Sequence, residues 1–236
     1  MTQQFVQIDP LDSPYPIPWS WVLATQAEHG SDRSWVTPQL YYYRTQALIS
    51  PDGHYAAYSR MQMQVLPDLA HSQVSSTLFV ENLRTRDLQT LAATSPFSNN
   101  PFAPNVEPAQ AGMIAIGIPV AWSEASDRLL SREFESLFGS DIASDYAVVW
   151  ERQSRQVRTL APAGLQYTNA VLLGWSQAYP EQALFRVCSL GDPDPQLCSV
   201  ALSGQTNLVP DDQPMSFGQV MNNIWAGPQA QSQVAS

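Results

Sequence analysis

Two pairs of closely spaced carboxylates are the residues of this sequence best suited to acid–base chemistry. Glu133 and Glu135 are separated by one residue, and so are Asp192 and Asp194. In a β-strand, side chains two positions apart share a face, so Glu133 and Glu135 would be neighbours. Neighbouring carboxyl groups separate their pKa values, as glycoside hydrolysis requires. Carboxylates are also the main charge of this chain, so such pairs are expected by chance.

Other catalytic signatures are absent from the sequence. The three histidines, His29, His54 and His71, lie in polar loop or turn sequences, and no Gly-x-Ser-x-Gly motif accompanies them. The chain contains no lysine, which excludes Schiff-base and P-loop lysine chemistry. No Cys/His ligand pattern, calcium loop or nucleotide-binding glycine motif is found. We therefore predict no catalytic residue, no cofactor and no metal site, and a chain that is not an enzyme.

The charge of the chain restricts its partners. The net charge is −10, with 11 basic and 21 acidic side chains, so a nucleic acid or an anionic membrane would be repelled. The longest apolar stretch, 111–122, is too short to span a bilayer. The first residues carry neither the basic nor the apolar region of a secretory signal. We expect a soluble cytoplasmic protein without an integral membrane segment.

The two cysteines, Cys188 and Cys198, flank a hairpin loop centred on Pro193. Counting from this proline places them opposite each other on two strands. In the cytoplasm they would be reduced, partly buried thiols, whereas an oxidising compartment would favour a cross-strand disulfide.

The elements that would position these residues are short strands in a repeated unit. Ser50-Pro51-Asp52-Gly53 separates two apolar runs and has the residues of a tight turn. Looser copies of this apolar strand, serine, turn and second strand recur at Ser123 and Ser176, where the serine is expected to hydrogen-bond at the strand end. Each copy is followed by a second hairpin, so the unit has four strands.

This unit resembles the TolB-type (WD40-like) β-propeller repeat family over 47–209. The resemblance rests on Ser50-Pro51-Asp52-Gly53 with 55–58, on Trp122-Ser123 and Trp175-Ser176, and on the hairpins at 83–91 and 152–160. Short propeller-repeat proteins of cyanobacteria are similar in style. The resemblance implies an all-β fold: a small or incomplete β-propeller of about three to four four-stranded blades. The Pro-Asp-Gly turn is lost in the second and third copies.

Four blades are the usual minimum for a closed propeller, so three visible units leave a gap. A degenerate fourth blade from 19–45, an open arc covered by the terminal segments, or another chain would each fill it. We divide the chain into an irregular N-terminal segment (1–38), a propeller-like domain (39–210) and a C-terminal helix with a disordered tail (211–236). Residues 19–28 fit a helix or a strand.

The C-terminal segment has helical spacing of apolar residues. Phe217, Val220, Met221, Ile224 and Trp225 would form one face of an amphipathic helix, which either folds back onto the sheets or docks on a partner. Trp19 and Trp21 are further candidates for partner contacts, because aromatic residues are enriched in binding hot spots and in cores alike.

These observations favour a non-enzymatic protein–protein interaction module, such as an accessory or assembly factor of a larger complex. The alternative is a carbohydrate-active hydrolase or lyase that uses a carboxylate pair in a propeller cleft. A third alternative is a periplasmic or lumenal TolB-like domain, for which a disulfide between Cys188 and Cys198 would be evidence.

Overall fold

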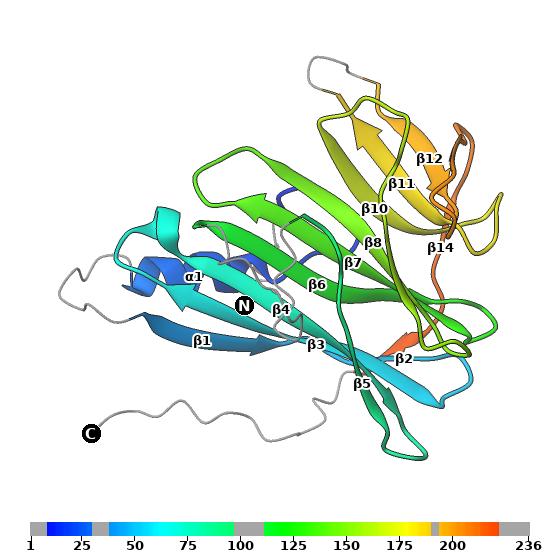
Figure 1. Ribbon diagram of the computed structural model, residues 1–236, viewed down its shortest axis with the longest axis horizontal. Coiled ribbons are helices and arrows are strands. Elements are labelled where there is room, and N and C mark those ends of the chain that lie inside the picture. The colour runs from blue at the N-terminus through cyan, green and yellow to red at the C-terminus, as the bar shows by residue number, and fades with distance from the viewer. Residues whose placement is uncertain (1–8, 30–37, 97–110, 190–193, 222–236) are drawn as a thin grey trace, which may run out of the picture.

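The computed structural model describes residues 9–29, 38–96, 111–189 and 194–221. Over these residues the chain consists mainly of β-strands with one α-helix, α1 (Trp19–His29) (Figure 1). This confirms the all-β class that the sequence predicted.

Three four-stranded antiparallel meanders follow one another along the chain. The first contains β2 (Leu48–Ile49), β3 (Tyr55–Val65), β4 (Gln73–Asn82) and β5 (Leu88–Leu91), with a 3-10 turn at Leu69–His71. The second contains β6 (Met113–Trp122), β7 (Arg128–Leu137), β8 (Ala143–Glu151) and β9 (Val157–Leu160). The third contains β10 (Asn169–Ser176), β11 (Ala183–Cys188), β12 (Gln196–Val200) and β13 (Thr206–Leu208). The predicted four-stranded unit is therefore present three times.

The first two meanders belong to one ten-stranded sheet, and the third forms a separate five-stranded sheet. A short parallel contact between Val74 of β4 and Ile114 of β6 joins the first two. An additional strand, β1 (Gln39–Arg44), pairs with β3 beyond the end of β2. Within the described residues, β1 pairs with β3 alone, so it lies at an edge of the sheet.

The second meander is buried on both faces, because successive side chains of a strand point in opposite directions. On one face Trp122, Leu129 and Trp150 pack against apolar residues of the first meander. On the other face a second apolar cluster includes residues of both the second and the third meander. This double burial explains why β6 is a nearly continuous apolar run.

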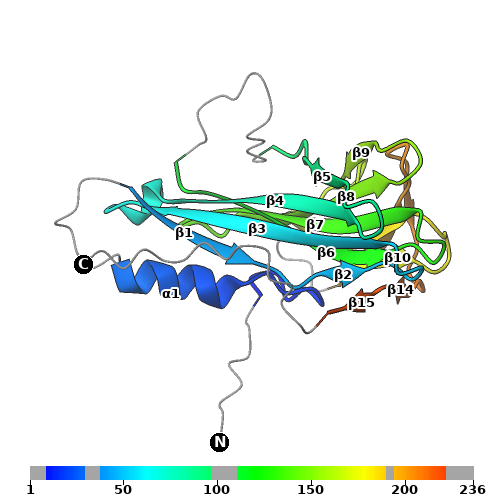
Figure 2. The same cartoon turned by 90° about the horizontal axis from the view of Figure 1, so that it is seen from below.

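Helix α1 and the segment before it cover the other end of the large sheet (Figure 2). Val22 and Ile17 are fully buried against strands β3, β4, β6 and β7. The sequence left 19–28 open between helix and strand and described 1–38 as irregular. The segment 19–29 is a helix, and packing of one of its faces on the sheet stabilises it in that form.

A C-terminal strap, residues 214–220, connects the three meanders. Its first part, β14 (Pro214–Met215), pairs with β10, and its last part, β15 (Gln219–Val220), pairs with β2. Between them, the carbonyl of Phe217 accepts a 2.8 Å hydrogen bond from the backbone amide of Trp122 at the end of β6. The strap thus adds backbone hydrogen bonds to the first strand of every meander.

The strap shows that the predicted amphipathic helix is wrong for 216–221. This segment is extended, because the strand edges offer it backbone partners that a short isolated helix cannot match. The remainder of that prediction, including Ile224 and Trp225, lies outside the described residues. In the described part of the chain, closure into a propeller ring is not seen: the first meander packs on the second and the second on the third, whereas the third is linked to the first by the strap.

The predicted opposition of the two cysteines is also wrong. Val187 pairs with Gln196, so Cys198 lies opposite Phe185, and Cys188 pairs with Asn169 of β10. The connection between β11 and β12 is not symmetric about Pro193, and this shifts the register. Both cysteines are free, and burial raises the pKa of the Cys198 thiol to about 11.

Candidate functional site

The three recurring serines close the turn after the first strand of each meander. The Ser50 and Ser123 hydroxyls donate 2.6 Å hydrogen bonds to Asp52 and Asp127, and the Ser176 hydroxyl donates a 2.5 Å bond to Asp212. Each serine oxygen also accepts a backbone amide of its own turn. The prediction that they are strand-end hydrogen bonders is therefore confirmed.

Sequence reasoning expected Asp52 to form side-chain hydrogen bonds in its turn, but it did not predict that the three serines bond to aspartates. In the first two meanders the partner follows within the same turn, but Asp212 comes from the segment just before the strap. Its other oxygen accepts the amides of Gln177, Ala178 and Gln213. Burial works against ionisation, but these hydrogen bonds lower the pKa of Asp212. Asp52 behaves alike: burial opposes ionisation, yet hydrogen bonds lower its pKa to about 2.

The carboxylate pair of β7 is brought together as predicted. Glu133 and Glu135 share one face of the strand and are only 5% and 4% exposed. Burial, followed by repulsion from Glu135, raises the pKa of Glu133 to about 8, so it holds its proton at neutral pH. Gly117, opposite on β6, leaves the space: a Cβ there would lie 2.5 Å from Glu133 Oε2. In the other predicted pair, Asp192 lies outside the described residues.

The opposite face of β7 carries a buried ion cluster. Arg132 is fully buried, and its Nε donates a 2.7 Å hydrogen bond to Asp145 of β8. Its two terminal nitrogens donate to both oxygens of Asp9 at 2.6 and 3.1 Å, and one also donates to the Tyr15 carbonyl. Burial raises the pKa of Asp145 to about 6 against the attraction of Arg132. The cluster fixes the N-terminal segment to the sheet, and its three side chains, Arg132, Asp9 and Asp145, are buried.

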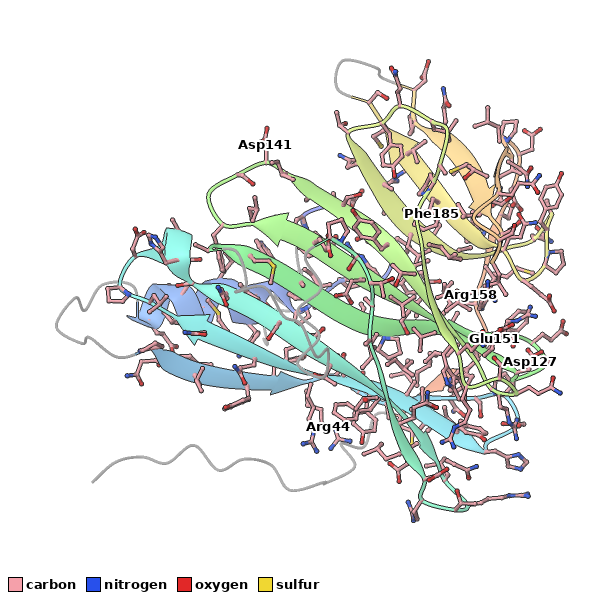
Figure 3. All side chains as sticks on the ribbon, in the orientation of Figure 1. Arg44, Asp127, Asp141, Glu151, Arg158 and Phe185 are labelled. Atoms are coloured by element: carbon pink, nitrogen blue, oxygen red, sulfur yellow. The ribbon has the colours of Figure 1, made fainter. Side chains whose placement is uncertain are left out.

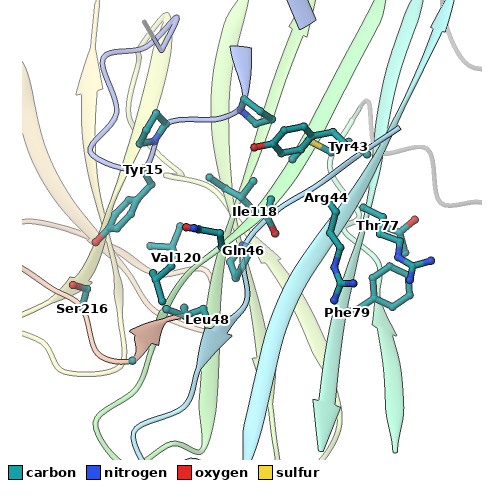
Figure 4. Close-up of a pocket in the computed structure, with 18 of the residues that line it drawn as sticks. Tyr15, Tyr43, Arg44, Gln46, Leu48, Thr77, Phe79, Ile118, Val120 and Ser216 are labelled. Carbon is teal, nitrogen blue, oxygen red and sulfur yellow. The ribbon is translucent and has the colours of Figure 1, made fainter. Parts of the chain in front are cut away.

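A wide groove of about 1290 Å³ lies between the first meander, the N-terminal segment and the strap (Figure 4). Pro14, Pro16 and Pro18 contribute to one wall, and residues 118–120 of β6 to another. The link between β1 and β2, with Thr45 and Gln46, borders it.

The rim of this groove carries exposed apolar side chains. Tyr42 of β1 is 58% exposed and Val220 of β15 is 51% exposed, and both line the groove. Leu40, two residues before Tyr42, and Met221, directly after Val220, are also exposed. Exposed apolar side chains that gather around a hollow are typical of interaction surfaces.

Two arginines in the groove rest on a pair of aromatic rings. Tyr58 and Phe79 face each other across β3 and β4 and stack with ring centres 5.4 Å apart. The Arg44 guanidinium lies 4.3 Å from the Tyr58 ring centre, and that of Arg60 lies 5.7 Å from the Phe79 ring centre. Figure 4 labels Arg44 and Phe79 among the side chains that line the groove, and Figure 3 places Arg44 far from Phe185 of the third meander.

The predicted partner-binding residues divide between this groove and the core. Phe217 and Val220 line the groove, and Met221 follows them, its amide bonded to the Ala47 carbonyl at 2.9 Å. Trp21 contacts Tyr43 of the groove with ring centres 5.4 Å apart. Trp19 packs instead on the buried ring of Phe134.

Sequence reasoning missed Arg44 and Arg60 as binding candidates. Each was read as an ordinary strand residue, and only the pairing register of β1 with β3 places them side by side. The signal that the sequence did offer is the apolar run Leu40–Tyr43, of which Tyr42 and Tyr43 are exposed in the structure.

The described residues contain no group of three or more His, Cys, Asp or Glu side chains placed to hold a metal ion. None of their helices combines the length and the hydrophobicity needed to cross a membrane.

No family model matches the chain, and no curated protein matches it. The site therefore has to be interpreted from its own geometry.

Proposed function

We propose that this chain is a non-enzymatic protein–protein interaction module that serves as an accessory or assembly factor of a larger complex. We also propose that its three meanders are repeats of the TolB type. The single observation that carries the proposed function is the groove of about 1290 Å³, because its rim exposes Tyr42 and Val220 to solvent. Burial of such side chains by a partner removes apolar area from water and stabilises the complex.

The meanders suit this role because they form a rigid frame. Three apolar clusters, the buried Arg132 cluster and the strap fix the elements that line the groove. A preorganised surface loses little conformational entropy when it binds.

Photo-crosslinking in cell extract of the source organism tests the proposal. Amine-reactive reagents are unsuitable because the chain has no lysine. A photoreactive phenylalanine analogue at Gln46, inside the groove, is expected to capture a partner protein in a stoichiometric band. The same analogue at Leu208, which is 58% exposed on β13 of the third meander, is the control.

A Tyr42→Asp substitution should abolish the Gln46 crosslink. Leu208→Asp is the matched control, since Leu208 is as exposed as Tyr42, at 58%. Equal crosslinking from both sites, or crosslinking unaffected by Tyr42→Asp, would contradict the proposed function.

A second candidate function, a carbohydrate-active hydrolase or lyase, draws on Glu133 and Glu135. An acid with a pKa of about 8 beside a second carboxylate is the pairing that general acid catalysis needs. Their burial argues against it, since a substrate has to reach both groups. Turnover on a glycoside panel that disappears in Glu133→Gln and Glu135→Gln, with the melting temperature not lowered, would support it. A panel without turnover leaves the interaction module as the proposal.

A further inference from the structure

We propose that the end of the C-terminal strap is a gate on the groove. β15 detaches from β2 by rotation about Gly218 while the three meanders stay folded, and the groove binds its partner when β15 is in place. The gate rests on the proposed function, because it regulates the same groove.

β15 is held by backbone hydrogen bonds rather than by buried side chains. Among the described residues it pairs with β2 alone, over two residue pairs, and the amide of Met221 adds one 2.9 Å bond to the Ala47 carbonyl. No side chain of the strap is buried, and Val220 and Met221 are 51% and 39% exposed. Burial of apolar area supplies most of the free energy that holds an element in place, so β15 opens at low cost.

The beginning of the strap is held far more firmly. Asp212, two residues before it, accepts the Ser176 hydroxyl at 2.5 Å and two backbone amides of the turn that follows this serine. Further along, the Phe217 carbonyl accepts the amide of Trp122, a residue that is fully buried. Loss of that bond would leave a buried amide without a partner, which is costly in free energy. The strap therefore stays attached as far as Phe217.

Gly218 lies between the firmly held part of the strap and β15. Its φ of 111° belongs to a region that residues with a Cβ rarely adopt, whereas glycine moves between this region and others without a steric penalty. A Cβ at this position would lie 2.9 Å from the Ile49 carbonyl oxygen, so the strap packs directly on β2 here. Hinges consist of a few residues that absorb such changes in backbone angle. Rotation at Gly218 releases β15 and leaves the bond between Phe217 and Trp122 intact.

Movement of β15 changes the groove directly. Val220 lines the groove and lies opposite Leu48 of β2, which also lines it and is labelled in Figure 4. Leu48 is only 6% exposed, and release of β15 uncovers it and removes Val220 from the rim. A partner that contacts Val220 binds the closed form more tightly, and its binding in turn shifts the strap toward that form.

Amide hydrogen exchange of the full chain, followed residue by residue by NMR, tests the hinge. The Met221 amide is expected to have a protection factor at least about tenfold lower than that of the Trp122 amide, because the first opens with β15 and the second does not. Low concentrations of urea should leave the exchange of Met221 unchanged, since a local opening exposes little surface. Equal protection of the two amides, or exchange of Met221 that accelerates with urea as much as that of Trp122, would overturn the inference.

A disulfide between β15 and β2 locks the gate. Gln219 and Ile49 are directly opposed in the antiparallel pair, and neither is among the described residues that line the groove, so cysteines at both positions suit a cross-strand bridge. Cys188→Ser removes the half-buried native thiol. Oxidation should raise the protection of Met221 to within about threefold of that of Trp122. The reduced form of the same variant is the matched control and should keep the difference between the two amides.

Capture of the partner connects the gate to the groove. Gly218→Ala disfavours the closed position, because the added Cβ meets the Ile49 carbonyl, and should reduce the crosslink from the photoreactive analogue at Gln46 by about threefold or more. Oxidation of the Ile49→Cys, Gln219→Cys pair in the same chain should restore the crosslink. A loss that oxidation does not restore would refute the gate, since it would mean that the added methyl group itself blocks the groove.

The two measurements separate this inference from the proposed function. A crosslink at Gln46 together with equal protection of Met221 and Trp122 refutes the gate and leaves the proposed function standing. No crosslink from Gln46 in the chain without other substitutions counts against both, because the gate then has no partner to control.

Discussion

Replacement of the buried, ionisable carboxyl of Glu133 should make the protein more stable, and increasingly so as the pH rises. The Glu133 carboxyl has a pKa of about 8 in the folded chain against 4.5 for an ordinary glutamate. Because the pKa is higher in the folded chain, the carboxyl releases its proton more easily in the unfolded chain. The free energy of unfolding therefore falls as the pH rises from about 4.5 to about 8. A glutamine at this position cannot ionise and is not subject to this loss.

The magnitude follows from the two pKa values. Each pH unit within that window corresponds to about 1.4 kcal/mol, so the gain from Glu133→Gln should reach about 3 kcal/mol at pH 7. At pH 5 it should be below about 1 kcal/mol, because that pH lies only about half a unit above the pKa of 4.5 in the unfolded chain. The exchange of a carboxyl for an amide of similar size leaves the space above Gly117 filled.

Urea unfolding followed by tryptophan fluorescence at pH 5, 7 and 8 measures the effect. Glu124→Gln, the same change in the exposed turn after Ser123, is the control for the substitution itself. A free-energy difference between Glu133→Gln and wild type that is the same at pH 5 and pH 8 would refute the reasoning. It would mean that Glu133 is ionised in the folded protein and stabilised there.

Three further predictions concern the contacts that hold the meanders together. Arg132→Leu should lower the unfolding free energy by about 3 to 5 kcal/mol in urea titrations, because Asp9 and Asp145 would be left buried without their cation; adding Asn at both positions should recover most of the loss. Gly218→Ala should lower the melting temperature by an amount equivalent to about 1 to 3 kcal/mol, because its φ is 111° and a Cβ would lie 2.9 Å from the Ile49 carbonyl oxygen; a melting temperature equal to wild type would mean that the strap does not hold β2. Asp212→Ala should cost about 1.5 to 3 kcal/mol at pH 7, and this difference should disappear as acid protonates the wild-type carboxylate, whose pKa is lowered in the fold; a constant difference down to low pH would contradict the hydrogen-bond assignment.

Local patterns were sufficient for much of the fold. The apolar runs that end at Ser50, Ser123 and Ser176 predicted the three turns, and the structure has a strand on both sides of each. The pairing of Glu133 with Glu135 on one face also followed from sequence, since the period of a strand is two residues. Such features depend on neighbours within a few residues.

The C-terminal segment shows where local patterns fail. The spacing of Phe217, Val220 and Met221 suits a helix, but open edges at β2, β6 and β10 provide backbone partners for an extended chain. Helical spacing is a weak preference, and long-range backbone hydrogen bonds override it.

The sequence by itself determined the all-β class, the repeated four-stranded unit and the acidic charge of this protein, because strand period, turn chemistry and composition are local properties. Tertiary structure alone decided that the second meander is buried on both faces, that the strap binds all three meanders, and that Arg44 faces Arg60. These features depend on register and on contacts between segments far apart in the chain, and no local pattern encodes them.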